Sequence, residues 1–300
     1  MSILEARGGA VYDRGYRPYD GPRGSRGAAT WALYKASIRR ALGIRRSWRQ
    51  KVAPFVLLGI VTIPAIVNVG IGYVTRDRLF TDRVDIITYR DYVGVSSALL
   101  LFVALVAPDV VCPDRRQHVL PLMFARPLTG VDYVIAKLAA IATILFAFSF
   151  LPQVVLYVGN MLVSDSALDY LTGHLDVLWQ VPVAVLLLAV YYAVVGVAIA
   201  SLTDRRIVAG AAIIGLFLVT SIAAGIFVGD YQLNGGSAAA LINVLALPLY
   251  LRDLVFLGHV DPESPLTGVQ GGGLLAIVSY VVVLLTGIGV LLRRYRWVER

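Results

Sequence analysis

Few residues in this sequence have the types and spacing that catalysis or metal binding requires. The histidines, His118, His174 and His259, lie far apart, and none belongs to the H-x-x-x-H pair of zinc sites. Cys112 is the single cysteine, so neither an internal disulfide nor a cysteine-based metal site can form. No serine lies in a G-x-S-x-G turn. The sequence therefore predicts no catalytic residue, no metal site and no cofactor held by this chain.

A phosphate-binding loop is missing as well. The nearest stretch, Gly130 to Lys137, has neither the second glycine of G-x-x-x-x-G-K-[ST] nor a Ser or Thr after the lysine. We therefore expect that the chain does not bind ATP by this mechanism and is not an enzyme by itself. A membrane-embedded enzyme is an alternative, but it would need an intramembrane cluster of serine, histidine or acids.

The composition indicates a chain that lies within a membrane. Of the 300 residues, 58% are hydrophobic and only 15% are charged, and the mean hydropathy is +0.75. Soluble globular chains have about 45–50% apolar and about 25% charged residues. The composition excludes a disordered or fibrous chain and most cytosolic enzymes. It predicts an all-α polytopic membrane protein, because helices satisfy their own backbone hydrogen bonds in lipid.

Six runs are long and apolar enough to span a bilayer, since about 20 helical residues cross about 30 Å of hydrocarbon. The third run is longer than a bilayer requires and contains Pro152, so we expect it to tilt, to kink or to project into the cytosol. A soluble bundle would need polar stripes, which these runs lack. The runs are 52–74, 92–111, 134–163, 177–202, 208–228 and 272–292.

The positions of lysine and arginine predict the orientation, because cytoplasmic loops are enriched in both. With the N-terminus inside, 22 of the 27 Lys and Arg residues lie in cytoplasmic segments. We therefore expect both termini in the cytoplasm and the chain in the plasma membrane. The net charge of +8 then reflects topology, and nucleic acid is not an expected partner because the soluble segments are too short for a folded basic face.

The N-terminal region divides into two predicted segments. Residues 1–27 are rich in Gly, Arg, Tyr and Pro and predict an extended cytoplasmic tail. Residues 28–51 predict an amphipathic interfacial helix, with an ordinary positive flank that only sets orientation as the alternative. The apolar positions of this expected lever helix recur at helical spacing and are Trp31, Tyr34, Ile38 and Leu42.

Two further segments lie outside the predicted spans. Residues 229–271 are expected outside the cell, and 238–258 is too interrupted for a crossing yet too apolar for a free loop. It predicts a short helix or a broken re-entrant pair at the outer face, followed by a glycine hinge at Gly271. Residues 293–300 predict a cytoplasmic tail, which leaves 52–292 as the six-span transmembrane domain.

Charged residues near the spans are rare. Asp109 and Lys137 lie near span ends, where we expect them at the cytoplasmic interface rather than in a proton path. An ion- or proton-coupled secondary transporter would carry carboxylates near the midplane of the membrane. None of the six runs has one at its centre, so this transporter class is an alternative and not the first expectation.

The predicted cytoplasmic loop at 113–133 has the composition of a protein-docking helix. Apolar side chains lie beside charged ones, which predicts buried anchors with a charged rim. The alternative is a plain interfacial loop. The candidate docking residues are Asp114, Arg115, Arg116, His118, Leu120, Leu122, Met123, Phe124, Arg126, Pro127 and Leu128.

This loop resembles the one before the third span in permease subunits of type-2 ATP-binding cassette (ABC) exporters. The family reads (A/S)-R-P-(L/V)-(S/T)-x-x-x-Y-x-x-x-K-(L/F), and this chain has Ala125-Arg126-Pro127-Leu128-Thr129, then Tyr133, then Lys137-Leu138. The six spans, the basic helix before them and the outer helical segment are similar to the family's arrangement, over about residues 28–292. The N-terminal tail is similar to that of actinobacterial members. The chain departs from the family at His118-Val119, where members often have Gly-Thr.

The resemblance implies a function and a set of partners. It implies that 113–133 contains the coupling helix, which docks in a groove of a separate ABC ATPase. Two such ATPase subunits, which carry ATP and Mg, a second permease chain and membrane lipid are the expected partners. The expected activity is export of a hydrophobic or amphipathic substrate such as a drug, a lipid or a natural product. A non-transporting complex of the same family is a further alternative.

Overall fold

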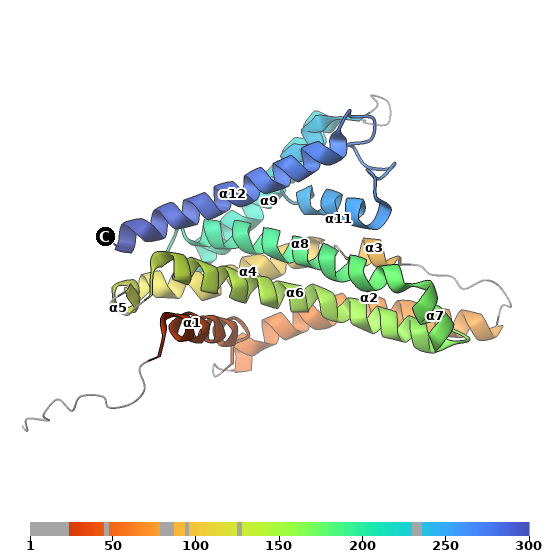
Figure 1. Cartoon of the computed structure of the whole chain (residues 1–300), viewed down its shortest axis with the longest axis horizontal. Helices are drawn as coiled ribbons and strands as arrows, with labels where there is room; N and C mark the ends of the chain where they lie inside the picture. The colour runs from red at the N-terminus through yellow and green to blue at the C-terminus, as the bar shows by residue number, and fades with distance from the viewer. Residues whose placement is uncertain are drawn as a thin grey trace, which may run out of the picture.

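The computed structural model describes residues 24–44, 48–78, 87–93, 96–124, 128–229 and 236–299, and all elements in these ranges are helical (Figure 1). Most of the predicted tail at 1–27 therefore lies outside the described residues. The elements are α1 (Arg26–Ala41), α2 (Trp48–Arg78), α3 (Tyr89–Tyr92), α4 (Ser96–Arg116), α5 (Leu120–Phe124), α6 (Gly130–Val163), α7 (Ala167–Gly173), α8 (Leu175–Ala200), α9 (Arg206–Val228), η1 (Ala238–Ile242), α11 (Leu247–Leu257) and α12 (Gly272–Glu299).

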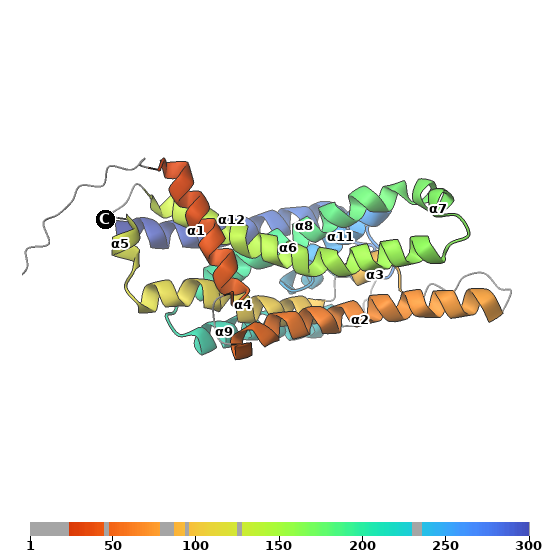
Figure 2. The same cartoon turned by 90° about the horizontal axis from the view of Figure 1, so that it is seen from below.

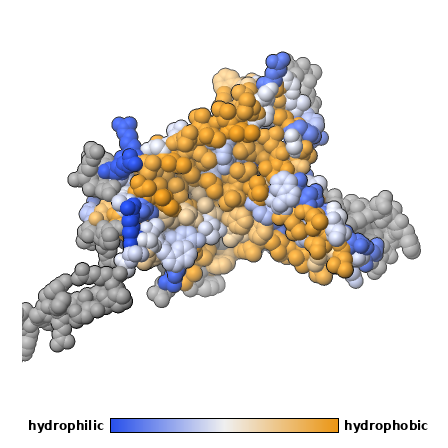
Figure 3. Space-filling model, in the orientation of Figure 1, coloured by the Kyte–Doolittle hydropathy of each residue, from blue (hydrophilic) through white to orange (hydrophobic). Residues whose placement is uncertain are grey.

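Five helices in the described part of the chain, α2, α6, α8, α9 and α12, are long and apolar enough to cross a membrane. They run roughly along the long axis of the molecule (Figures 1 and 2). We call the end that carries α5 and the C-terminus the α5 end, and the opposite end, which carries α7, the α7 end. Hydrophobic side chains cover most of the face in Figure 3, and hydrophilic ones gather toward the two ends. The fold is that of a polytopic membrane protein.

The second predicted span, 92–111, differs from the structure. Tyr92 ends the short helix α3, and a separate helix, α4, begins at Ser96 and continues to Arg116. The C-terminal part of α4 contains the charged residues Asp109, Asp114, Arg115 and Arg116. The helix α4 is not among the five candidate spans, and a sixth crossing stays a prediction.

The helix at the centre of the bundle is α8. In its apolar window 72% of the residues are buried, against 44% or fewer in the other four candidate spans. It packs against α4, α6, α9, α11 and α12. The core of the molecule therefore lies around α8, and the outer surfaces of the other long helices remain exposed and apolar.

The predicted N-terminal helix is present but shorter than 28–51. It ends as α1 at Ala41, and Gly43 follows with a φ of +65°. The amides of Gly43 and Ile44 donate to the carbonyl oxygens of Arg40 and Arg39, which is the hydrogen-bond pattern of a glycine-terminated helix. A new helix, α2, then begins at Trp48. Because α1 crosses the long axis at the α5 end and packs on α6 and α4 (Figure 2), it contacts the bundle directly.

The third predicted span forms the longest helix, α6, of 34 residues with Pro152 inside it. A capping box formed by Thr129 and Asp132 stabilises its first turn. The Thr129 side chain accepts from the Asp132 amide, and the Asp132 carboxylate accepts from the Thr129 amide at 3.0 Å. This capping box sets the start of α6 four residues before the predicted span.

The segment 238–258, predicted to be a short helix or a broken re-entrant pair, contains two helical elements, η1 and α11; its place at the outer face of a membrane stays a prediction. Two tyrosines of α8 bind the turn between them: Tyr191 and Tyr192 donate to the carbonyl oxygens of Val244 and Leu245, each at 2.8 Å. Gly271, with a φ of +69°, then turns the chain into α12 at the predicted glycine run. The segment is thus held against the bundle by hydrogen bonds to its backbone.

The predicted cytoplasmic tail at 293–300 is helical as far as residue 299, and its place in the cytoplasm stays a prediction. The helix α12 continues to Glu299. Tyr295 is buried in the last turns, with its ring centroid 4.7 Å from that of Tyr133 on α6. This packing stabilises α12 beyond the apolar run on which the prediction depended.

Gly210→Ala is expected to lower thermal stability, because α9 touches α4 at this residue. A Cβ at Gly210 would lie 2.9 Å from the carbonyl oxygen of Ala104. This oxygen belongs to the backbone, so it cannot move away as the end of a flexible side chain could. Overpacking of this kind costs about 1–3 kcal/mol. Gly215→Ala on the same helix is the matched control, since nothing lies within 4 Å of its Cβ position. Thermal unfolding in detergent measures both, and equal melting temperatures would contradict the close approach.

Candidate functional site: a charged node beneath α5

Five side chains from four helices meet next to α5, and we call this group the charged node. The helix α1 supplies Arg40, α4 supplies Asp114, α6 supplies Tyr133 and Lys137, and α12 supplies Tyr295. All four helices reach the α5 end of the molecule (Figure 1). The node therefore joins elements that are far apart in the sequence.

Asp114 is the centre of the node, and its side chain is fully buried. Its Oδ2 lies 2.6 Å from Lys137 Nζ and accepts a hydrogen bond from the Tyr133 hydroxyl at 3.0 Å. Its Oδ1 accepts from the guanidinium of Arg40. Lys137 Nζ also donates to the carbonyl oxygen of Val110 at 3.0 Å. Each buried charge thus has a partner, as low-dielectric surroundings require.

The ionisation of Asp114 follows from these partners. Burial alone would raise the pKa of its carboxyl group. The positive charges and hydrogen bonds of Lys137 and Arg40 outweigh that effect and hold the pKa of Asp114 below its ordinary value. The node therefore keeps an ionised carboxylate between two cationic side chains.

Acid is expected to weaken the node. The folded-state pKa of Asp114 lies below the unfolded value, so its ion pairs contribute stability that is fully present above about pH 4. That stability is lost as the pH falls through the lower folded value. Melting temperatures of the detergent-purified chain between pH 6 and pH 3 should fall more steeply for the wild type than for Asp114→Asn. An identical acid dependence in both proteins would refute this role of the carboxylate.

The helix α5 lies directly on the node. Phe124 meets Tyr133 edge-on, with ring centroids 6.2 Å apart. Leu120 and Leu128 are buried, and Met123 is partly buried against the core, as is Phe124. Of the predicted apolar docking anchors, Leu120 and Leu128 therefore face the bundle, and Met123 and Phe124 are only partly exposed; docking by this loop stays a prediction. A five-residue helix is not stable alone, so α5 gains its stability by burying its apolar side chains against the bundle.

The charged rim predicted for the loop is only partly present. Asp114 is buried in the node, and Arg115 donates to the carbonyl oxygen of Ser201, which ties α4 to the end of α8. The side chain of Leu122 and residues Arg126 and Pro127 lie outside the described residues. Their predicted contribution to docking stays a prediction.

The exposed surface at this end is polar. Four residues at the end of α4 and on α5 are exposed, and we call them the α5 face: Arg116, Gln117, His118 and Pro121. Two of them, Arg116 and His118, belong to the predicted docking set. Gln117 and Pro121 do not belong to that set, because the prediction selected strongly apolar and charged side chains.

A left-handed residue shapes the turn between α4 and α5. His118 has a φ of +51°, a conformation that favours glycine. The His118 amide donates to the Arg115 carbonyl oxygen and the Val119 amide to that of Asp114, which is the Schellman arrangement at a helix end. The resembled family often has glycine at this position. The turn therefore forms here with a histidine at its left-handed position.

The four predicted lever residues of α1 divide into two pairs. Trp31 is 55% exposed and stacks on Tyr34, whose hydroxyl lies 3.0 Å from that of Thr143 on α6. Ile38 and Leu42 are partly buried against the core. The helix is therefore attached to α6 along its length, and one aromatic side chain faces outward.

The two predicted span-end charges have different surroundings. Asp109 pairs with Arg206 of α9, and both line a cavity of about 1280 Å³ between α4 and α9. Lys137 is buried in the node, because Asp114 lies within ion-pair distance and compensates the charge of the lysine. Its place at the cytoplasmic interface of the membrane stays a prediction.

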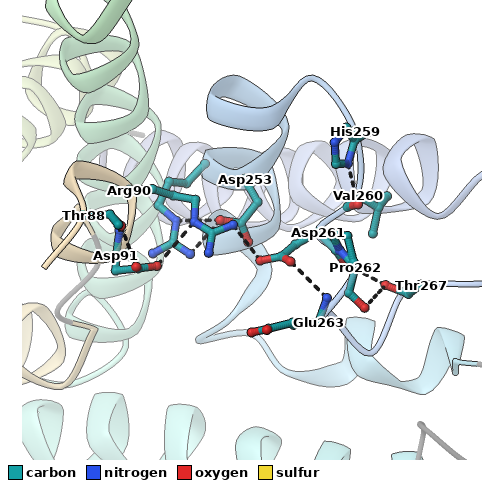
Figure 4. Close-up of polar contacts among 11 residues, drawn as sticks. Thr88, Arg90, Asp91, Asp253, His259, Val260, Asp261, Pro262, Glu263 and Thr267 are labelled. Atoms are coloured by element: carbon teal, nitrogen blue, oxygen red, sulfur yellow. Dashed lines mark hydrogen bonds and ion pairs between the residues drawn. The ribbon is translucent and has the colours of Figure 1, made fainter. Parts of the chain in front are cut away.

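A second polar cluster lies at the α7 end, between α3, α11 and the loop before α12 (Figure 4). Arg90 lies 2.8 Å from Asp261 and 3.3 Å from Asp91, and Arg252 pairs with Asp253 at 2.7 Å. Burial would lower the pKa of Arg90, but Asp261 and Asp91 raise it, whereas burial raises the pKa of Asp253 despite Arg252. These charges pair with one another, so the cluster fastens α3 to the segment that contains α11.

The chemistry available at the node is charge pairing. It contains one carboxylate, a lysine, an arginine and two tyrosines, and Asp114 and Lys137 have no access to solvent. Elsewhere in the described ranges, no three His, Cys, Asp or Glu side chains gather closely enough to hold a metal ion.

Sequence reasoning missed three members of the node, Arg40, Tyr133 and Tyr295. A signal was available for Tyr133, since it precedes Lys137 by four residues and therefore shares its helix face. Arg40 and Tyr295 have no such local signal, because their partners lie on other helices.

No protein-family model matches the chain, and no curated protein matches its sequence. The function is therefore inferred from the geometry of the node and from the resemblance in the loop at 113–133.

Proposed function

We propose that the chain is the membrane subunit of an ATP-driven exporter of the ABC type, with its ATPase on a separate protein. The observation that carries this proposal is the charged node beneath α5. Through one buried carboxylate and the rings around it, the node connects α5 with α1, α4, α6 and α12. A force on α5 would therefore reach four helices at once, as a coupling element requires.

In the proposed mechanism, α5 transmits force from the ATPase to the helix bundle. ATP binding brings two ATPase subunits together, and they press on the α5 face. Phe124 contacts Tyr133, which donates to Asp114, and Asp114 pairs with Arg40 of α1 and Lys137 of α6. Separating a buried pair costs several kcal/mol, so these helices move together. The movement rocks the bundle and opens the path outward.

The proposed orientation places the α5 end in the cytoplasm, with α4 as the sixth crossing and both termini inside the plasma membrane. The exposed arginines at this end support it, because cytoplasmic ends are enriched in positive charge. They are Arg116, Arg205, Arg206 and Arg296. A second permease chain, identical or different, completes the transport path.

The proposed substrate is hydrophobic or amphipathic, such as a drug, a lipid or a natural product. Apolar side chains dominate the five candidate spans. A path built from such helices favours substrates that partition into the membrane over strongly charged ones.

Purification of the tagged chain from its native membrane in mild detergent tests the proposal. We expect a soluble ATPase with a phosphate-binding loop to accompany it in comparable amount, and ATP-dependent flux in vesicles that contain both. A chain that purifies alone, with no ATPase attached after crosslinking through Gln117→Cys, would refute the proposal.

An ion-coupled carrier is the second candidate, and the buried Asp114–Lys137 pair is the observation that favours it, since paired carboxylates and lysines buried within a bundle serve as proton relays in such carriers. It predicts substrate flux driven by a proton gradient without ATP. In a carrier, Asp114→Asn would abolish the proton-driven flux. In an exporter of the ABC type, by contrast, flux would occur only when the ATPase and ATP are present.

A further inference from the structure

The cavity between α4 and α9 lies toward the α5 end of the molecule, where these two helices pack against each other (Figure 2). Its volume of about 1280 Å³ has room for about forty groups of the size of a water molecule, far more than one inorganic ion fills. Charged and polar side chains line it at the end of α4 and at the start of α9, and apolar side chains line the adjoining turns of both helices. The cavity is therefore amphipathic.

The charged part of the cavity has an excess of arginine. Arg206 pairs with Asp109, so these two charges compensate each other. Arg116 and Arg205 are exposed, and no carboxylate in the described part of the chain lies within ion-pair distance of either. One further acid, Asp204, also lines the cavity and leaves this part with a net positive charge. An anion with several acceptor oxygens complements it, because guanidinium groups bind phosphate oxygens in pairs.

The apolar part of the cavity continues into the outer surface of the bundle. Leu105 of α4 is 41% exposed, and Ile207 and Val208 of α9 are 88% and 50% exposed. Exposed aliphatic side chains are unfavourable in water but not among acyl chains. The helix α9 is a candidate membrane span that begins at Arg206, so the arginines lie where headgroups meet the hydrocarbon of a bilayer. Charge and apolar surface thus follow each other as the headgroup and the chains do in a phospholipid.

We propose that this cavity binds an anionic phospholipid, with its phosphate at Arg116 and Arg205 and its acyl chains along Leu105 and Val208. Basic pockets between membrane helices suit such headgroups, since each arginine near an anionic lipid contributes favourable electrostatic energy. A zwitterionic phospholipid carries its own cation beside the phosphate and gains less from the arginines. Binding needs only this chain and does not depend on the proposed export function. Arg116 also belongs to the α5 face, so the test uses Arg205, which does not.

Photolabelling of the purified full-length chain in detergent tests the proposal, with phosphatidylglycerol that carries a diazirine in one acyl chain. We expect saturable labelling of the segments that contain Leu105 and Val208, with competition by plain phosphatidylglycerol. Phosphatidylcholine with the same diazirine chain should label them about fivefold less, the factor that corresponds to one arginine beside an anionic lipid. Inorganic phosphate should not compete, because it lacks the acyl chains. Competition as strong as that of phosphatidylglycerol would indicate a site for free phosphate and overturn the proposal.

Two pairs of variants locate the lipid in the cavity. Arg205→Gln should lower labelling by phosphatidylglycerol about fivefold. Arg296→Gln should not lower it, because Arg296 is exposed on α12 and does not line the cavity. Leu105→Trp should fill the apolar part and abolish saturable labelling of the segment that contains Val208. Leu101→Trp, four residues earlier on α4, should keep it, because Leu101 is also exposed but does not line the cavity.

Three results would overturn the proposal. Equal labelling by the two phospholipids would mean that any acyl chain binds and that the arginines do not select an anion. Unchanged labelling in Arg205→Gln would contradict the position of the phosphate. Unchanged labelling in Leu105→Trp would show that the lipid binds outside the cavity.

Discussion

Pro121→Asp is expected to reduce the stimulation of the partner ATPase at least about tenfold without lowering the stability of the membrane chain. Pro121 is exposed on α5, and exposed substitutions usually change stability by about 0.5 kcal/mol or less. An aspartate in the first turn of a helix is also compatible with the helix dipole. A carboxylate buried without a partner in a docking groove, by contrast, costs more than the roughly 1.4 kcal/mol that corresponds to a factor of ten.

ATPase assays of the complex reconstituted in vesicles measure this effect, and melting of the detergent-purified chain measures stability. Leu168→Asp is the matched control, because Leu168 is 73% exposed on α7, at the opposite end. We expect wild-type stimulation from the control. If Pro121→Asp stimulates the ATPase as strongly as Leu168→Asp does, the α5 face is not the docking surface.

Lys137→Met is expected to lower the free energy of unfolding by roughly 3–5 kcal/mol, because it leaves the fully buried carboxylate of Asp114 without its buried cationic partner. The double variant with Asp114→Leu should recover most of the loss. Replacing both members of a buried pair with apolar residues is often close to neutral, since no charge is left desolvated. Arg40 can then turn to solvent, as its side chain is already 30% exposed.

Thermal unfolding in detergent measures the three proteins, and we expect the single variant to melt about 6 °C or more below the wild type. Arg26→Gln is the control, because Arg26 also joins α1 to α6, through Asp132 at 2.7 Å, but is 57% exposed. Such a pair contributes about 1 kcal/mol or less. A loss in Lys137→Met no larger than that in Arg26→Gln, or a double variant as unstable as the single one, would contradict the energetic role of the node.

The sequence alone determined the long helices and the membrane class. An apolar run of about 20 residues forms a helix in lipid wherever it lies, because its backbone has no other donors or acceptors. Five predicted spans are accordingly present as apolar helices. Local signals also sufficed for the broken segment at 238–258, where Pro248 lies at the start of α11 and Gly258 at its end.

Helix ends were predicted less well, for two reasons. The predicted lever helix continued to residue 51 because basic residues matched its pattern, whereas Gly43 adopts a left-handed φ and ends α1. The helix α12 extends past the predicted span because Tyr295 packs on Tyr133. The end of α1 could be predicted from the sequence, because Gly43 is a local signal. The end of α12 could not, because it depends on a contact with another helix.

Only the tertiary structure decided which residues of the loop at 113–133 are available to a partner. Composition places apolar and charged residues there, but exposure depends on what packs against each side chain. Leu120 and Phe124 have the bundle as a neighbour and turn inward, and Gln117 and Pro121 remain outside. Asp114 is buried because Arg40, 74 residues earlier, and Lys137 on α6 compensate its charge. A charge can leave water only where such partners converge, and that convergence is a property of the folded chain.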